Sequence, residues 1–357
     1  MASEDISQFF EGHHEVEECE PDDTGERENN TNTRWTRCAK NPGHVDFIPI
    51  KDFSLSHLPA GFQDYDLYRL IKGFADLTVR INVKFTSLKR PKLLIGTKTP
   101  YPCYNLRGSS LMRTGTGKIW RKIEMFKDQN DKTCPCPVCV KSSEPSKTWA
   151  RVYVATATHV LYDDTEVEKC ECAVGYDDVT GPKETLRGWC MDAPGDSSDM
   201  TYFSCVTHDL DLAETLEKTR FVSDDLWVRM WMRYGNPLST GQHITAVQLL
   251  GDLFKLVVQH NNSPSQLASC TSAQQESPKD DKFMFVVSHP HGYFKHVSVG
   301  RWVHRQEVLR DGTKYTYTSA TCPGSSGAII YRLGCNWSLH PHSGSNKSFN
   351  FSGIGLG

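Results

Sequence analysis

Short runs of strand-forming residues, divided by glycine, proline and aspartate turns, recur along the chain after residue 92. Runs this short match the length of β-strands, and they are too short for most helices. Turn residues between such runs indicate antiparallel hairpins. The sequence therefore predicts a mainly β fold, either a barrel or a sandwich. The runs are Lys92-Leu-Leu-Ile95, Lys118-Ile-Trp120, Arg151-Val-Tyr-Val-Ala155, Phe283-Met-Phe-Val-Val287, Lys314-Tyr-Thr-Tyr-Thr318 and Ala328-Ile-Ile-Tyr331.

Two segments depart from this pattern and have the spacing of helices. Residues 62–78 carry apolar side chains every three or four positions, which predicts an amphipathic helix. Residues 241–258 have a similar period and lead into a polar stretch, residues 260–282. We interpret this second pair as an inserted helix followed by a flexible loop.

The chain divides by composition into three parts. Residues 1–45 are polar and acid-rich, which predicts a disordered tail. Residues 46–94 form a helical extension, in which Lys89-Arg-Pro-Lys92 is a basic patch that we expect in a solvated loop. Residues 95–357 form the strand-rich domain. It carries a cysteine-rich insertion near residues 130–145 and a helix-and-loop insertion near residues 215–282.

Charge and hydropathy exclude several classes of function. The net charge is −3, so no overall basic field favours nucleic acid. The first residues lack the pattern of a secretory signal, and no apolar run reaches the roughly 18 to 20 residues of a membrane helix. We therefore expect a cytoplasmic protein without a membrane or nucleic-acid partner. In a reducing compartment the 13 cysteines are expected to be thiols or metal ligands.

Three separated motifs contain the residue types of nucleophilic catalysis. Gly324-Ser-Ser-Gly327 forms a tight turn ahead of a strand, His159 follows another strand, and Asp209 and Asp211 alternate with leucines. A serine hydroxyl needs a base, the base needs an orienting carboxylate, and the oxyanion needs backbone donors. Each motif also has an ordinary alternative: the glycine-flanked turn fits a linker, His159 fits a buried structural histidine, and the two aspartates fit surface carboxylates.

Taken together and in order, these motifs resemble the chymotrypsin-fold serine peptidases, and most closely the HtrA-type. The resemblance covers residues 95–357 and implies two six-stranded antiparallel β-barrels. It also implies a serine endopeptidase that acts on a protein or peptide and needs no cofactor for catalysis. The implied catalytic residues are His159, Asp211 and Ser326, and the amides of Gly324 and Ser326 would form the oxyanion hole. The matching segments are Arg113-Thr-Gly-Thr-Gly-Lys-Ile119, Ala157-Thr-His-Val160, Asp211-Leu-Ala213, Ser288–Gly300 and Pro323-Gly-Ser-Ser-Gly-Ala328.

One departure from the family bears on activation. Secreted trypsins carry an aspartate directly before the nucleophile, and it pairs with the new amino terminus after cleavage. Ser325 occupies that position here, so we expect no activation by proteolytic cleavage. The alternative to an enzyme is a catalytically inactive copy of the fold that serves as a protein-binding module.

The strand after the nucleophile predicts the substrate pocket. His342-Ser-Gly344 resembles the His-Val-Gly of picornaviral cysteine peptidases with the same fold, in which the histidine recognises glutamine or glutamate. We therefore assign the pocket to His342, with His340 as the less favoured candidate and Cys322 as a further lining residue. The hypothesis is a preference for Glu or Gln before the scissile bond. The alternative is that these histidines lie in an exposed loop.

Cys134-Pro-Cys-Pro-Val-Cys139 has the close thiol spacing of a structural zinc site. Cys134, Cys136 and Cys139 would supply three ligands, and Cys103, Cys170, Cys172 or a histidine would supply the fourth. The alternative is a loop of free thiols. A zinc-dependent enzyme or nucleic-acid binder is disfavoured, since the sequence has no His-Glu-x-x-His motif and no basic, aromatic surface pattern.

Overall fold

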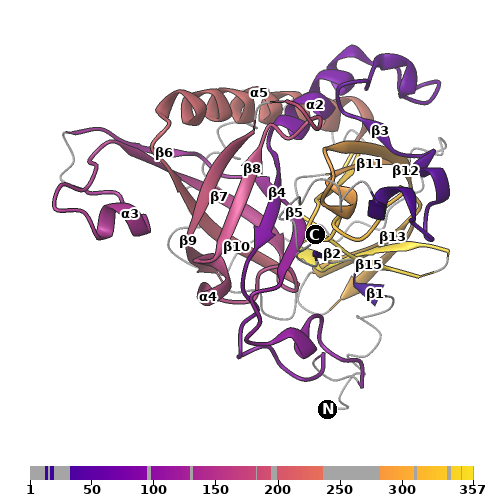
Figure 1. The fold of residues 1–357 in the computed structure, drawn as a ribbon. Helices are drawn as coiled ribbons and strands as arrows, with labels where there is room; N and C mark the ends of the chain where they lie inside the picture. The colour runs from indigo at the N-terminus through magenta and orange to yellow at the C-terminus, as the bar shows by residue number, and fades with distance from the viewer. Residues whose placement is uncertain are drawn as a thin grey trace.

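A computed structural model describes residues 13–14, 17–19, 33–94, 98–128, 132–181, 183–193, 199–235, 282–308, 312–335, 339–346 and 348–356 (Figure 1). The predicted helix over residues 241–258 and nearly all of the polar stretch after it lie outside these residues. The described part consists mainly of antiparallel strands, arranged in two sheets that lie side by side.

The first sheet closes into a six-stranded barrel, because β7 pairs with both β10 and β5. Closure removes the unpaired edges that an open sheet would expose. The strands around the barrel are, in order, β5 (Met112–Ile119), β4 (Thr78–Val83), β8 (Cys170–Val174), β9 (Glu184–Ala193), β10 (Met200–Thr207) and β7 (Trp149–Ala157); β6 (Glu124–Phe126) adds to β7 and β2 (Glu17–Cys19) adds to β5.

The second sheet is formed mainly by strands that follow α5. A bridge between Ile329 and Pro341 brings the start of its last strand, β14, next to the start of its first, β15. The strands are, in order, β15 (His342–Ser345), β16 (Asn350–Ser352), β13 (Gly312–Tyr317), β12 (His296–Val308), β11 (Phe283–Ser288) and β14 (Ile330–Arg332); β1 (His13–His14) adds to β15, β3 (Ile48–Pro49) to β12 and β17 (Gly355–Leu356) to β13. The barrel and this second sheet confirm the predicted chymotrypsin-like fold.

Two long helices lie across one end of both sheets (Figure 1). α2 (Tyr65–Asp76) begins at the N-cap Asp64, whose side chain accepts hydrogen bonds from the next turn, and it confirms the helix predicted within residues 62–78. Its apolar face includes Phe74, whose ring stacks on Tyr331 of β14 at 4.4 Å. Burial of one such side chain contributes about 1.5–3 kcal/mol. The other helices are α5 (Leu210–Tyr234), α3 (Pro137–Val140), α4 (Asp164–Val167) and the 3₁₀ turns η2 (Pro42–His44), η3 (Leu55–His57), η4 (Tyr104–Leu106) and η6 (Pro290–Gly292).

The predicted domain boundaries need correction. β4 lies within the helical extension that we expected over residues 46–94, yet it pairs with β5 and β8 inside the barrel. The barrel therefore starts at Thr78 and not near residue 95. The predicted strand at residues 92–95 reduces, in its described part, to one bridge between Leu93 and Pro100.

The prediction of a disordered tail over residues 1–45 is wrong for the described residues in that range. Trp35 stacks on His44 at 3.6 Å between ring centroids and on His296 at 4.6 Å. Phe47 and Ala320 complete an apolar cluster around these rings. Composition indicated disorder because this stretch has few apolar residues, but the ring of Trp35 packs against His296 of the second sheet and holds the segment there.

No helix among the described residues is long and apolar enough to span a membrane.

Candidate active site

His159 and Ser326 come from different sheets and meet between them. His159 lies in a turn at the end of β7, where the amide of Val160 donates to the carbonyl of Ala157. Ser326 lies in the turn before β14. Nε2 of His159 is 2.9 Å from Oγ of Ser326. The exposed fractions of His159 and Ser326 are 1% and 0%.

Asp199 supplies the carboxylate that contacts His159. Its two oxygens lie 2.9 and 2.8 Å from Nδ1 of His159, and one of them also accepts the backbone N–H of His159. Ser343 of β15 donates to the same carboxylate at 2.6 Å. An ionised Asp199 accepts the Nδ1–H of the ring, so Nε2 is left to accept the proton of Ser326.

Asp211 does not occupy this position, and the interpretation of its Asp-Leu-Ala sequence as a catalytic match is wrong. The segment in which Asp209 and Asp211 alternate with leucines is the beginning of α5. Asp209 caps that helix by accepting from the amide of Leu212 at 2.9 Å, and Asp211 is exposed in its first turn. An acidic residue at a helix N-terminus is favoured for capping and dipole reasons, so the motif reflects a helix start.

Sequence reasoning missed Asp199, because a strand pairing visible only in the tertiary structure places it beside His159. Asp199 directly precedes β10, whose first residue, Met200, pairs with Ala157 at the end of β7. In an antiparallel pair the start of one strand lies beside the end of the other. A carboxylate just before β10 therefore reaches a histidine just after β7. The backbone carbonyl of Asp199 also accepts from Thr158 at 3.1 Å.

Close contact with the barrel holds the turn that carries Ser326. The amide of Thr116 in β5 donates to the carbonyl of Ser326, and its hydroxyl donates to the carbonyl of Gly324, both at 2.8 Å. Gly324 and Gly327 have φ angles of +92° and +86°. A Cβ on Gly327 would lie 2.1 Å from Oγ1 of Thr156, so the backbone geometry and the close approach both require glycine here.

The three predicted pocket residues lie in different surroundings. Nδ1 of His342 is 2.6 Å from the hydroxyl of Tyr317. Nε2 of His340 is 2.8 Å from the hydroxyl of Thr313, and its ring packs edge-on against Tyr315. The sulfur of Cys322 contacts residues of the N-terminal part of the chain, described below. The histidines are both fully buried, so the alternative of exposed loop histidines is excluded.

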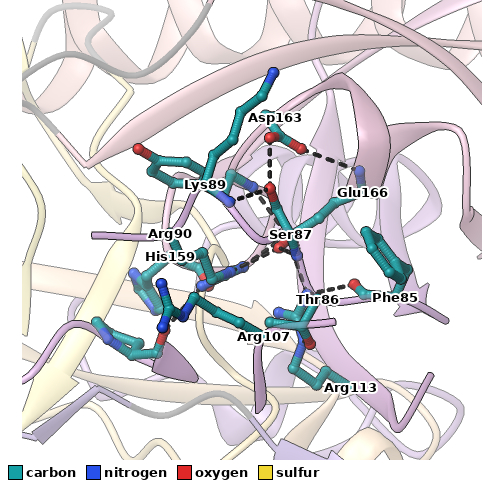
Figure 2. A network of polar contacts seen from close by, with 12 residues as sticks. Phe85, Thr86, Ser87, Lys89, Arg90, Arg107, Arg113, His159, Asp163 and Glu166 are labelled. Atoms are coloured by element: carbon teal, nitrogen blue, oxygen red, sulfur yellow. Dashed lines mark hydrogen bonds and ion pairs between the residues drawn. The ribbon is translucent and has the colours of Figure 1, made fainter. Parts of the chain in front are cut away.

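A buried ion-pair network supports the His159 turn from behind (Figure 2). Glu166 accepts from Nε and Nη2 of Arg90, both at 2.6 Å, and forms an ion pair with Arg113 at 3.0 Å. Arg90 also donates to the carbonyl of His159, and Arg113 donates to that of Val160, each at 3.0 Å. The expectation that residues 89–92 form a solvated loop is therefore wrong for Arg90, which is 1% exposed.

The charges of this network stabilise one another. Burial alone would raise the pKa of Glu166, but hydrogen bonds from Arg90 and the charges of both arginines outweigh burial and lower it. Burial also opposes the charge of Arg90, and Glu166 offsets that effect and raises the pKa of the guanidinium. All three side chains are fully buried, so each depends on the others for its charge to be tolerated.

Cys134, Cys136 and Cys139 lie together, and His208 joins them from the end of β10. The four donor atoms are within 4.8 Å of one another. Nε2 of His208 is 3.5 Å from the sulfur of Cys139 and 3.9 Å from that of Cys136. His208 is therefore the side chain that adds the fourth donor atom to this cluster. Cys172 instead contacts Cys205 inside the barrel, at 3.7 Å.

No family model and no curated protein matches this chain. Among solved structures it is similar to the HtrA-type protease AlgW with a tripeptide, at 9% identity over 80% of this chain and 58% of that one, with a TM-score of 0.34. It is also similar to the active form of the Rv3671c protease from M. tuberculosis, at 11% identity over 80% of this chain and 78% of that one, with a TM-score of 0.35. The chain thus spans less than two thirds of the AlgW structure.

Proposed function

We propose that this protein is a serine endopeptidase in which Ser326, His159 and Asp199 form the catalytic triad. The observation that carries the proposal is the single imidazole of His159, which bridges Oγ of Ser326 and the carboxylate of Asp199. Three separated segments are needed to build this arrangement, and it is the arrangement that activates a serine for acyl transfer.

In the proposed mechanism Ser326 attacks the scissile carbonyl while His159 Nε2 takes its proton. The imidazolium then donates that proton to the leaving amine, and water hydrolyses the acyl-enzyme through the same histidine. Asp199 holds the ring in the correct tautomer and stabilises its charge. The amides of Gly324 and Ser326 serve as oxyanion donors. In support, the carbonyl oxygens of both residues accept hydrogen bonds from Thr116 and therefore point toward the barrel.

For substrate choice we assign His342 to recognition of Glu or Gln before the scissile bond. In this assignment the Tyr317 hydroxyl donates to Nδ1 of His342. A neutral His342 then carries its own proton on Nε2. That N–H then donates to the side-chain oxygen of the substrate. His340 contacts Thr313 and Tyr315 instead, so we give it no part in recognition.

We also propose that activation requires no cleavage. The hydroxyl of Ser325 is 3.0 Å from that of Ser288 and accepts from the amide of Cys322 at 3.2 Å. These internal contacts support the turn where an activation-dependent protease uses an aspartate paired with its new amino terminus.

A structural zinc ion is proposed at Cys134, Cys136, Cys139 and His208. Three thiolates and one imidazole form a donor set typical of structural zinc. The ligands join the loop between β6 and β7 to the end of β10, so the ion would stabilise one end of the barrel. Catalysis in the proposed mechanism needs no metal.

A fluorophosphonate probe tests the central proposal. The purified full chain is expected to be labelled covalently, and Ser326→Ala is expected to abolish labelling, because the probe reacts only with an activated serine. Ser325→Ala is the matched comparison: it removes a hydroxyl that supports the turn but keeps the nucleophile, so it is expected to slow labelling without abolishing it. A peptide library incubated with the same protein is expected to be cleaved after Glu or Gln.

The outcomes separate the alternatives. Failure of a folded full chain to react would favour the binding-module interpretation. Labelling that depends on Ser325 and not on Ser326 would refute the triad. Cleavage mainly after Arg, Lys or large apolar residues would refute the role of His342 and leave the triad intact.

A further inference from the structure

A second set of soft donor atoms lies beside the nucleophile turn. Cys38, His44, His291 and Cys322 place one donor atom each within 4.8 Å of one another. The sulfurs of Cys38 and Cys322 are 3.6 Å apart, and Nε2 of His44 is 3.5 Å from the sulfur of Cys322. Zinc has bonds of about 2.3 Å to sulfur and about 2.0–2.1 Å to nitrogen, which sets tetrahedral ligands about 3.3–3.8 Å apart. Both separations fall in that range.

The surroundings of this cluster resemble the outer shell of a metal site. The backbone amide of Asn41 donates to the sulfur of Cys38 at 3.4 Å, and its side-chain amide donates to that of Cys322 at 3.1 Å. Such N–H···S bonds stabilise thiolate ligands and orient them. The ring of Trp35 covers His44, and an apolar cluster with Phe47 and Ala320 shields the group from water.

We propose that Cys38, His44, His291 and Cys322 bind a second structural zinc ion. The two thiolates and two imidazoles form the Cys₂His₂ donor set that zinc prefers. The ligands come from three separate segments, so no spacing motif announces the site in the sequence.

This ion positions the catalytic turn. Cys322 lies four residues before Ser326, and the amide of His291 donates to the carbonyl of Pro323 at 2.5 Å. A Cβ on Gly324 would lie 2.6 Å from the carbonyl oxygen of His289 and 2.7 Å from the amide of Gly292. Zinc would thus join the N-terminal segment and the η6 turn to the base of the nucleophile turn, without contact with the reacting atoms.

Metal analysis of the purified full chain tests both zinc sites together. The expected content is two zinc ions per chain, falling to one in Cys38→Ser and to one in Cys136→Ser. Cys335→Ser removes a half-buried thiol outside both clusters and is expected to keep both ions. Circular dichroism checks that each variant is folded, and His44→Ala serves as a second variant of the new site.

A zinc content unchanged by both Cys38→Ser and His44→Ala would refute the new site, as would a Cys38–Cys322 disulfide in protein purified without oxidant. For the positioning role, the fluorophosphonate labelling rate is expected to fall about tenfold or more in Cys38→Ser, but not in Cys136→Ser. Loss of one ion with an unchanged labelling rate would leave the metal site standing and overturn the positioning role.

An independent observation concerns two short strands at the start of the chain. β1 adds to the edge of β15, with His14 opposite Gly344, next to the Ser343 that bonds Asp199. β2 adds to β5, with Glu17 opposite Thr114, two residues from the Thr116 that bonds Ser326. These two pairings flank the triad, one on the second sheet and one on the barrel.

The connection between these strands is short. His14 and Glu17 are three residue steps apart, and three steps span at most about 11 Å. The position of His14 on the edge of β15 and that of Glu17 on the edge of β5 are therefore at most about 11 Å apart. Addition of an extended strand to a sheet edge is a common way for a protein to bind a peptide.

We infer, on the basis of the proposed protease function, that the N-terminal segment inhibits the enzyme by occupying the edges of β15 and β5, to which an extended substrate would add as a strand. It acts as an intramolecular competitor that a substrate must displace.

A full-length His13→Pro, His14→Pro variant removes both backbone N–H donors of β1, which weakens strand pairing. Its fluorophosphonate labelling is expected to be about tenfold faster than that of the wild type. The control His13→Ala, His14→Ala keeps both donors and is expected to label at the wild-type rate. Equal rates in all three proteins would overturn the inhibition while leaving the protease in place. Labelling in none of them would instead refute the protease function.

Discussion

Replacement of Asp199 with asparagine is expected to lower kcat/KM for peptide cleavage by about 10⁴-fold, the scale seen when the triad carboxylate of a serine protease is made neutral. The physical reason is the tautomer of His159. An asparagine can turn its NH₂ toward Nδ1, and the ring then carries its proton on Nε2, where it cannot accept from Ser326. The rate is measured with a chromogenic peptide that has Glu before the cleaved bond.

Asp211→Asn is the matched control, because it makes the same chemical change at an exposed carboxylate in the first turn of α5. It is expected to leave kcat/KM unchanged. Urea denaturation of both variants separates loss of activity from loss of folding, which matters because Asp199 also accepts a backbone hydrogen bond from His159. If Asp211→Asn lost the activity and Asp199→Asn retained it, the proposed triad would be wrong.

The largest effect on stability is expected at Glu166. Glu166→Gln keeps the shape of the side chain but leaves the guanidinium groups of Arg90 and Arg113 buried without a counter-charge. Breaking a buried ion pair in this way costs about 3–5 kcal/mol in the free energy of unfolding. Urea denaturation measures this loss. Because the turn of His159 rests on both arginines, the labelling rate is expected to fall as well.

Glu171→Gln provides the comparison. Glu171 pairs with Lys84 at 2.7 Å, but both side chains are more than 30% exposed, and such pairs contribute about 0–1 kcal/mol.

The contribution of Glu166 to stability depends on pH with a definite sign. The pKa of Glu166 is lower in the folded protein than its ordinary value of 4.5, so its stabilisation is complete above that value and is lost as the pH falls through the folded pKa. Equal losses of stability in Glu166→Gln and Glu171→Gln would contradict the stabilising role of the buried ion pairs.

Local patterns predicted the parts of the fold that depend on neighbours in the chain. The spacing of apolar residues predicted α2, and short runs between turn residues predicted β5, β7, β11, β13 and β14. Glycine at residues 324 and 327 indicated the sharp turn around Ser326, because the required backbone angles are open mainly to glycine. The thiol cluster from Cys134 to Cys139 could also be predicted, because the three cysteines are close together in the sequence.

The prediction of Asp211 shows where local patterns mislead. Asp-Leu-Ala fits a family motif and also fits the first turn of a helix, and only packing decides between them. α5 needs a cap at Asp209 and extends for 25 residues, so the segment is a helix. Arg90 shows the same limit: a basic tetrapeptide is usually solvated, yet Glu166, 76 residues later, makes its burial favourable.

The sequence by itself determined a mainly β chain with a reactive-looking serine turn and a histidine at a strand end. The tertiary structure alone decided which carboxylate meets that histidine. It also decided which histidine joins the cysteine cluster, and that residues 38 and 44 lie against residues 291 and 322. The reason is physical: a triad or a metal site requires atoms within about 3–4 Å of one another, and the barrel closure and sheet registers that bring them together are set by packing over the whole molecule.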